Sequence, residues 1–258
     1  MTNSKNANRQ KTIDTVQEFI DLIEKVKTEN ERKGNKAELL FRGQAVDKPL
    51  LPKLARLKLN GSITNVEDLI LAEFKRGILP LTEFKPENNW DLLALAQHHG
   101  LPTRLLDWTY NALVALWFAV ERPAKRNEKN ELENGVVWIL GANVEDFRTN
   151  TDKIDPLDNK ITKIFRSSVV SRRISAQAGV FTIHKINKNK KMIRFETHAG
   201  FKTKLIKAVI PHSSFANIRR QLNVLGVNYS TIYPDIDGFC KHLERRFSKL
   251  DDEIIDID

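Results

Sequence analysis

The segment that most restricts the fold is residues 112–120, Ala-Leu-Val-Ala-Leu-Trp-Phe-Ala-Val, which contains no polar side chain. A helix that is apolar on every side is stable in water only when other elements surround it. We therefore predict a buried central helix over residues 111–121, with Asp107 or Thr109 as its N-cap. Residues 135–140, Gly-Val-Val-Trp-Ile-Leu, predict a central strand.

Apolar residues at helical spacing predict further helices, and short apolar or alternating runs predict further strands. The predicted helices cover residues 13–29, 65–78, 90–97, 215–225 and 239–250. The predicted strands cover residues 37–41, 180–184, 192–195, 204–210 and 229–233. Because helices come first along the chain and most strands later, we predict an α+β fold. Its N-terminal helices would pack on a mainly antiparallel sheet formed largely by the C-terminal half.

The length of 258 residues predicts one large domain. We place it at residues 37–250, after an N-terminal helix and linker (residues 1–36) and before an acidic tail (residues 251–258). Residues 1–11 are polar and are expected to be disordered. The chain has no run of about eighteen apolar residues, and its start lacks the apolar core of a secretory signal. We therefore expect a cytoplasmic protein without a membrane segment.

The lone cysteine, Cys240, excludes an internal disulfide framework and a cysteine-rich zinc site. It lies on an apolar helical pattern beside Phe239 and Leu243, so we expect it to be buried. His98 and His99 have no acidic or cysteine partner at the spacing of metal ligands. The sequence therefore predicts no metal site.

Positive charge is concentrated in one part of the chain. Residues 160–207 contain thirteen Lys or Arg against a single acid, Glu196, a net charge of +12, whereas the whole chain carries +9. Such a field attracts an anionic partner: nucleic acid, a dinucleotide or an acidic surface. The alternative is a solvated strand hairpin whose edge lysines discourage aggregation. The residues expected to contact nucleic acid are Lys188, Lys190, Lys191 and Arg194.

Two motifs place arginines where a ligand could be held. Residues 40–44, Leu-Phe-Arg-Gly-Gln, put Arg42 at the end of a short apolar strand. Residues 97–109, Gln-His-His-Gly-Leu-Pro-Thr-Arg-Leu-Leu-Asp-Trp-Thr, put Arg104 in a turn. A guanidinium at such a place can hold a phosphate or carboxylate through two hydrogen bonds. Alternatively, each arginine ties loops together, and Arg104 could pair with Asp107.

Residues next to the two arginines are further candidates for binding a ligand or for catalysis. Gly43 would let the backbone turn or let a ligand approach closely. His98 or His99 could serve as a general base or ligand, or could satisfy loop carbonyl groups. Trp108 offers a flat face for stacking a base or nicotinamide, although a tryptophan at this place could equally belong to the core.

Two later segments also carry polar residues at unusual places. Residues 173–181 read Arg-Ile-Ser-Ala-Gln-Ala-Gly-Val-Phe. Strand alternation puts Arg173, Gln177 and Gly179 on one side of this segment, and these residues are a poor composition for a side that faces the core. Asp235 and Asp237 flank one residue before the last predicted helix. Asp237 suits a helix N-cap, so Asp235 is the better candidate for a catalytic carboxylate.

These segments together resemble the FRG domain, which is named for its Phe-Arg-Gly motif. The resemblance rests on Phe41-Arg42-Gly43 and on residues 97–109, 173–181 and 233–238, and it spans about residues 37–243. Tyr233 stands where the family is expected to have phenylalanine. FRG domains occur widely in bacteria, and the resemblance implies a role in defence or toxin systems.

An aromatic-Arg-Gly sequence at the end of an early strand also resembles the first motif of the arginine-containing ADP-ribosyltransferases, in which this arginine holds an NAD phosphate. The Asp-x-Asp at residues 235–237 resembles their acidic end, although those enzymes have a glutamate pattern there and their Ser-Thr-Ser motif is missing here. The resemblance implies NAD as the cofactor. Its binding residues would be Arg42, Gly43, Thr103, Arg104 and Trp108. The catalytic residues would be His99, Gln177 and Asp235.

The leading hypothesis is therefore an ADP-ribosyltransferase-like enzyme in which a carboxylate stabilises the positive charge of an oxocarbenium-like state. In a rival hypothesis the chain is a non-enzymatic nucleic-acid-binding module that uses residues 160–207. A third hypothesis is hydrolysis of a nucleotide or ADP-ribose bond, with His98 or His99 as the base.

Overall fold

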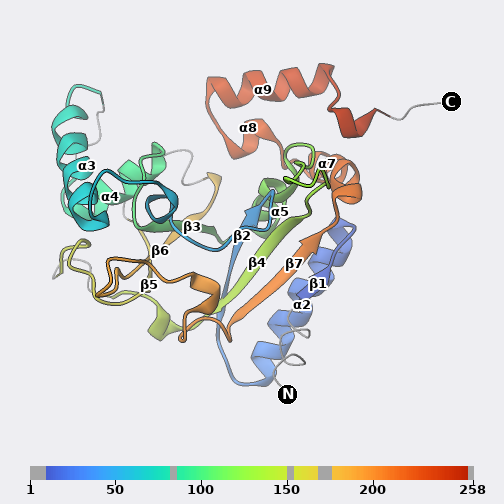
Figure 1. The fold of residues 1–258 in the computed structure, drawn as a ribbon. Coiled ribbons are helices and arrows are strands. Elements are labelled where there is room, and N and C mark those ends of the chain that lie inside the picture. The colour runs from blue at the N-terminus through green and yellow to red at the C-terminus, as the bar shows by residue number, and fades with distance from the viewer. Residues whose placement is uncertain (1–9, 82–85, 150–153, 168–175, 255–258) are drawn as a thin grey trace.

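A computed structural model of the chain describes residues 10–81, 86–149, 154–167 and 176–254. In this part of the chain, seven strands form one sheet in the order β1-β7-β4-β2-β3-β6-β5 (Figure 1). β1 runs parallel to β7, and the other neighbours are antiparallel. The strands are β1 (Gln10–Thr12), β2 (Glu38–Gln44), β3 (Leu105–Thr109), β4 (Gly135–Ala142), β5 (Lys163–Phe165), β6 (Gly179–Ile183) and β7 (Leu205–Ile210). The predicted α+β class is confirmed.

The helices interleave with the strands along the chain. They are α2 (Val16–Arg32), α3 (Ile63–Gly77), α4 (Asn89–His98), α5 (Ala112–Val120), α7 (Phe215–Val224), α8 (Tyr229–Ile232) and α9 (Ile236–Phe247). α5 is the predicted central helix, but its N-cap is Asn111, whose side chain accepts hydrogen bonds from the N–H groups of Leu113 and Val114. The predicted capping residues Asp107 and Thr109 lie instead in β3. None of the described helices is long and apolar enough to span a bilayer.

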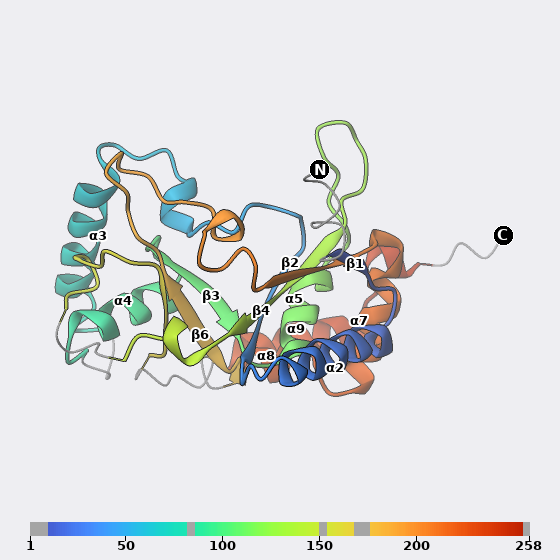
Figure 2. The same cartoon turned by 90° about the horizontal axis from the view of Figure 1, so that it is seen from below.

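The helices cover one face of the sheet, and loops with short 3-10 helices cover the other (Figures 1 and 2). On the helical face, α2, α5 and α7 pack over β4 and β7. α3 and α4 pack over β3, β5 and β6 on the same face. On the opposite face, Leu40, Leu106 and Leu140 are among the residues covered by Phe147 and Phe201 from loops and by Phe195 from a 3-10 helix.

Several strand predictions were wrong. Residues 229–233 form α8, because Asn228 caps the first turn and accepts from Ser230 N and Thr231 N. In residues 192–195, Met192 makes only an isolated bridge with Ile186, and Phe195 begins a 3-10 helix. β1, β3 and β5 were not predicted. Four of the seven described strands, β4 to β7, nevertheless lie in the C-terminal half of the chain, as expected.

The prediction that Cys240 is buried was also wrong, because α9 turns its apolar side to solvent. Cys240 is exposed, and Ile236 and Phe247 are 81% and 82% exposed. The rotation of α9 is fixed by Gly238, where an added Cβ would lie 1.9 Å from the carbonyl oxygen of Tyr233. Only a glycine permits this approach, so the polar side of α9 faces the protein.

A buried ion pair joins α3 to the segment before β3. Arg104 and Glu67 are 2% and 0% exposed. The guanidinium Nε of Arg104 lies 3.0 and 2.8 Å from the two carboxylate oxygens of Glu67, and Nη2 lies 2.5 Å from one of them. Its Nη1 donates to the carbonyl oxygens of Pro156 and Leu157, at 3.2 and 2.9 Å. This pair therefore ties three segments together, and the predicted pairing of Arg104 with Asp107 was wrong.

We expect Arg104→Ala to lower the free energy of unfolding by about 3–5 kcal/mol, because it leaves the Glu67 carboxylate buried without its counter-charge. Urea denaturation followed by circular dichroism measures the loss. The matched control is Arg76→Ala, which removes the exposed ion pair with Glu73 on the same helix and should cost less than about 1 kcal/mol. Equal losses for the two variants would contradict a structural role for the buried pair.

Candidate functional site

The sheet has a gap between its two halves at β2 and β3. β2 pairs with β4 along its whole length, from Glu38 with Ala142 to Gln44 with Val136. The register of β2 with β3, in contrast, contains one residue pair, Phe41 with Thr109. Beyond that pair the strands separate, and backbone groups on both edges lose their partners in the ladder. This separation creates the space for a site.

A cavity of about 350 Å³ lies at this gap, on the helical face between α4 and α5. Side chains two residues apart share a face of the sheet, so Phe41, Asp107 and Thr109 face the helices. Arg42 and Trp108 alternate to the opposite face and border the cavity at the gap between the two strands. The lining residues are Phe41, Arg42, Gly43, Gln97, His98, Asp107, Trp108, Thr109, Phe118, Gln177, Gly179, Phe181 and Tyr233. Four of the predicted binding or catalytic residues, Arg42, Gly43, Trp108 and Gln177, border this one cavity; their roles stay predictions.

The Arg42 side chain extends into the gap between the strands. Its Nη1 donates a 2.7 Å hydrogen bond to the Asp107 carbonyl oxygen and lies 3.7 Å from the Asp107 carboxylate. Among the described residues its buried Nε has no hydrogen-bond partner. Burial lowers the pKa of Arg42, and the Asp107 charge partly offsets this; a guanidinium nevertheless stays charged. The cavity therefore contains a cation whose hydrogen bonds are incomplete.

The second charged group of the cavity is the Asp107 carboxylate, which sequence reasoning assigned to a helix cap. The Gln97 Nε2 atom donates to its two oxygens, at 3.0 and 2.9 Å. The Gln97 amide is oriented in turn by Thr103, whose hydroxyl donates to Gln97 Oε1 at 2.6 Å. A signal for Asp107 was present in Leu-Leu-Asp-Trp-Thr, because strand alternation puts Leu105, Asp107 and Thr109 on one side.

The third wall comes from the start of β6 and the end of α8. Gln177 Nε2 donates to the Ile232 carbonyl oxygen at 3.3 Å. The next residue, Ala178, has φ +45°, a left-handed conformation that costs energy for a residue with a side chain and that accumulates at functional sites. Tyr233 packs edge-on against Phe118, with ring centroids 6.5 Å apart. From the sequence, Tyr233 was noted only as a departure from the family motif and was not predicted as a site residue. In the structure Tyr233 lines the cavity.

The other predicted site residues lie elsewhere or face away. Arg104 and Thr103 are buried behind the cavity, so neither can touch a ligand there without rearrangement. His99 is the exposed C-cap of α4, and its neighbour His98 lines the cavity instead. Asp235 caps α9 by accepting from Gly238 N at 2.8 Å, the role predicted for Asp237.

Trp108 borders the cavity, but its indole belongs to the core on the opposite face of the sheet. Its Nε1 donates to Thr182 Oγ1 at 3.1 Å, and Thr182 is linked to His184 Nε2, also at 3.1 Å. Burial lowers the pKa of His184 to about 3, so this imidazole is neutral. Stacking of a ligand on Trp108 is therefore incompatible with its position. Arg173 lies outside the described residues.

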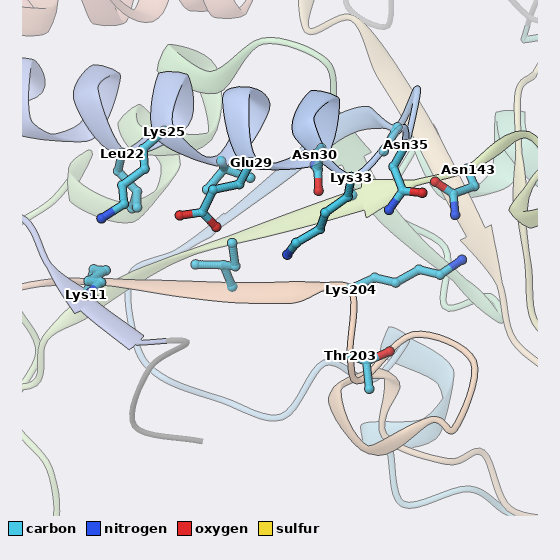
Figure 3. A pocket seen from close by; sticks show the side chains of 14 residues that line it. Lys11, Leu22, Lys25, Glu29, Asn30, Lys33, Asn35, Asn143, Thr203 and Lys204 are labelled. Carbon is cyan, nitrogen blue, oxygen red and sulfur yellow. The ribbon is translucent and has the colours of Figure 1, made fainter. Parts of the chain in front are cut away.

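A separate hollow of about 650 Å³ lies between α2 and the start of β7 (Figure 3). Glu29 of α2 and Lys33, the C-cap of this helix, point into it. The charge of Lys204 is compensated by Asp146, 2.5 Å from its Nζ. None of the predicted site residues lines this hollow, so we place the candidate site at the gap between β2 and β3.

Comparison with known proteins gives one match. The family model of the FRG domain matches residues 37–128, so an FRG domain is present in this part of the chain. The matched segment includes β2, α4, β3 and α5, which supply most of the cavity lining. No curated protein and no solved structure matches the chain. The resemblance to ADP-ribosyltransferases thus rests on the motifs alone.

The glycine of the Phe-Arg-Gly motif has a packing role that the structure makes explicit. A Cβ on Gly43 would lie 1.8 Å from the Ala115 carbonyl oxygen and 3.0 Å from Ala119 N. The α5 backbone therefore lies directly on β2, at a distance that only glycine allows. The expected use of Gly43 in a turn was wrong, because it lies inside β2 and forms no left-handed turn.

We expect Gly43→Ala to lower the free energy of unfolding by about 1–3 kcal/mol, the usual cost of a methyl group inserted into a packed core. Gly77→Ala is the control, because no atom lies within 4 Å of its added Cβ. It should be neutral or slightly stabilising, since alanine is the better helix former. Thermal unfolding of both variants measures the difference, and an unchanged melting temperature for Gly43→Ala would contradict the close approach of α5.

Proposed function

We propose that the cavity between β2 and β3 binds NAD or a related nucleotide and that the chain is an ADP-ribosyltransferase-like enzyme. The observation that carries this proposal is the incomplete hydrogen bonding of Arg42, a largely buried cation that lines the cavity with 18% of its side chain exposed. Burial of a charged donor without its full set of partners is costly. An anionic phosphate of the ligand would supply the missing acceptors.

The volume of the cavity sets what it can hold. At about 350 Å³ it lies at the lower end of the range for small-molecule sites. We infer that one nucleotide half of NAD enters, with a phosphate on Arg42 and the nicotinamide ribose toward Asp107. Phe118 and Tyr233 supply apolar ring surface beside this position.

The transfer reaction breaks the bond between ribose C1′ and the nicotinamide nitrogen, and nicotinamide leaves with the electron pair. Positive charge develops on the ribose, and the Asp107 carboxylate is placed to stabilise it. In this proposal Asp107 replaces Asp235 as the catalytic carboxylate, because Asp107 lines the cavity. The acceptor then donates an electron pair to C1′ and loses its proton to solvent.

Calorimetry with NAD tests the binding step. We expect Arg42→Ala to weaken binding roughly tenfold to a hundredfold, the value of a charge-assisted hydrogen-bonding group. Arg122→Ala removes an exposed cation outside the cavity lining and is expected to bind NAD normally. Absence of NAD binding by the unmodified protein, or equal affinity in Arg42→Ala, would count decisively against the site.

Nicotinamide release tests the chemical step. We expect Asp107→Asn to keep NAD binding and to lose turnover by about a hundredfold or more, the usual effect of removing one electrostatic stabiliser. Free ADP-ribose as the sole product would instead favour the hydrolase hypothesis, with His98 in place of His99 as the candidate base.

A further inference from the structure

The described basic residues of the segment 160–207 differ in their partners. Several of them are engaged with acidic groups elsewhere on the surface. Arg166 binds the Glu38 carboxylate, Lys204 binds Asp146 and Lys207 binds Asp47. These residues contribute little field to a partner, because a nearby carboxylate compensates each charge.

Four of the remaining lysines gather around one cavity. It has a volume of about 430 Å³ and is lined by Lys160, Lys185, Lys188 and Lys190. All four lysines are exposed, and among the described residues none has a carboxylate within ion-pair distance. Asp158 is the one acidic side chain among its described lining residues. The cavity therefore carries a net positive charge with vacant donors.

The hairpin that supplies two of these lysines has a twin in the same chain. In residues 186–192, Asn187 Oδ1 accepts from the N–H groups of residues 189 and 191. In residues 126–132, Asn127 Oδ1 accepts from the N–H groups of residues 129 and 131 in the same pattern. Both hairpins close through one bridge, Ile186 with Met192 and Arg126 with Leu132. The two turns are thus built alike.

The twin hairpins differ in charge. Residues 127–131 read Asn-Glu-Lys-Asn-Glu, whereas residues 187–191 read Asn-Lys-Asn-Lys-Lys. The turn geometry therefore does not require the lysines. At the left-handed position the first hairpin has Asn130, with φ +63°, and the second has Lys190, with φ +56°. Asparagine is favoured there and lysine is not.

Lys190 also makes a contact outside its own hairpin. Its Nζ lies 3.4 Å from Thr64 Oγ1, in the first turn of α3, across the cavity. A lysine held in an unfavourable backbone conformation and directed into a basic cavity is consistent with selection for binding, since turn stability alone would favour asparagine.

We infer that this cavity binds the phosphodiester backbone of a nucleic acid. The cations extend beyond the cavity to Lys191 and Arg194, both exposed, which is more than a single phosphate group requires. The cavity lining contains no aromatic side chain among the described residues. Binding therefore depends on phosphate contacts, with a steep salt dependence and little base preference. This site is distinct from the proposed NAD cavity and does not depend on it.

The twin hairpin supplies the test. Lys188→Glu, Lys190→Asn and Lys191→Glu together copy residues of the first hairpin onto the second, so the turn is preserved. Fluorescence anisotropy with a labelled RNA of about 20 nucleotides should show binding at least tenfold weaker than that of the unmodified protein. The slope of log affinity against log salt should fall by about 2, because each lysine contact with a single strand contributes about 0.7. The melting temperature should stay unchanged or rise, because asparagine suits the left-handed position of the turn better than lysine does.

The control variant changes net charge by the same amount on α2 and its C-cap, with Lys25→Glu, Lys33→Glu and Lys27→Asn. It should retain RNA binding, as should Arg42→Ala, which separates this inference from the proposed NAD site. Equal loss in the α2 variant would show a general charge effect and overturn the inference. Binding of sodium pyrophosphate that depends on the same lysines, without RNA binding, would overturn it in favour of a small anion.

Discussion

The separation of β2 from β3 after one residue pair is the constraint on which the site depends. If the ladder continued, Arg42 and Asp107 would lie in a closed sheet, and no cavity would exist between α4 and α5. α5 helps to hold β2 in place, because its backbone contacts Gly43 directly. The Arg42 guanidinium then occupies the gap and binds a carbonyl oxygen that the ladder leaves free. The Phe-Arg-Gly motif is therefore explained by packing and by hydrogen bonding together.

Arg42 and Arg104 show that the surroundings of an arginine, and not its residue type, decide whether it has a structural role or can bind a ligand. Arg104 has a carboxylate and two carbonyl oxygens around it, so its charge and donors are satisfied within the protein. Arg42 has one carbonyl and a carboxylate at 3.7 Å, and its Nε is unsatisfied among the described residues. A satisfied buried pair stabilises geometry, whereas an unsatisfied buried cation can gain from a ligand.

Sequence patterns predicted the helices and strands that have long apolar runs. They did not predict features that depend on contacts between distant parts of the chain. α5 and β4 were predicted because continuous apolar runs must be buried. β3 was missed because Gly100 and Pro102 favoured a turn through a stretch that then becomes a strand. The convergence of Arg42 and Gln177 was predictable from their motifs, but the burial of Arg104 was not. Its partner Glu67 lies 37 residues away on a helix that gave no sign of a buried acid.

The two anion sites proposed for this chain would differ in physical character. A ligand on Arg42 meets a largely buried guanidinium at low local dielectric, so added salt should weaken its binding little and shape should matter. A ligand on the lysines around Lys190 meets exposed ammonium groups, so its binding should fall steeply with salt and should tolerate many shapes. A buried, oriented cation suits a small substrate held at one reacting atom. Exposed, flexible cations suit the backbone of a long polyanion, for which many weak contacts are enough.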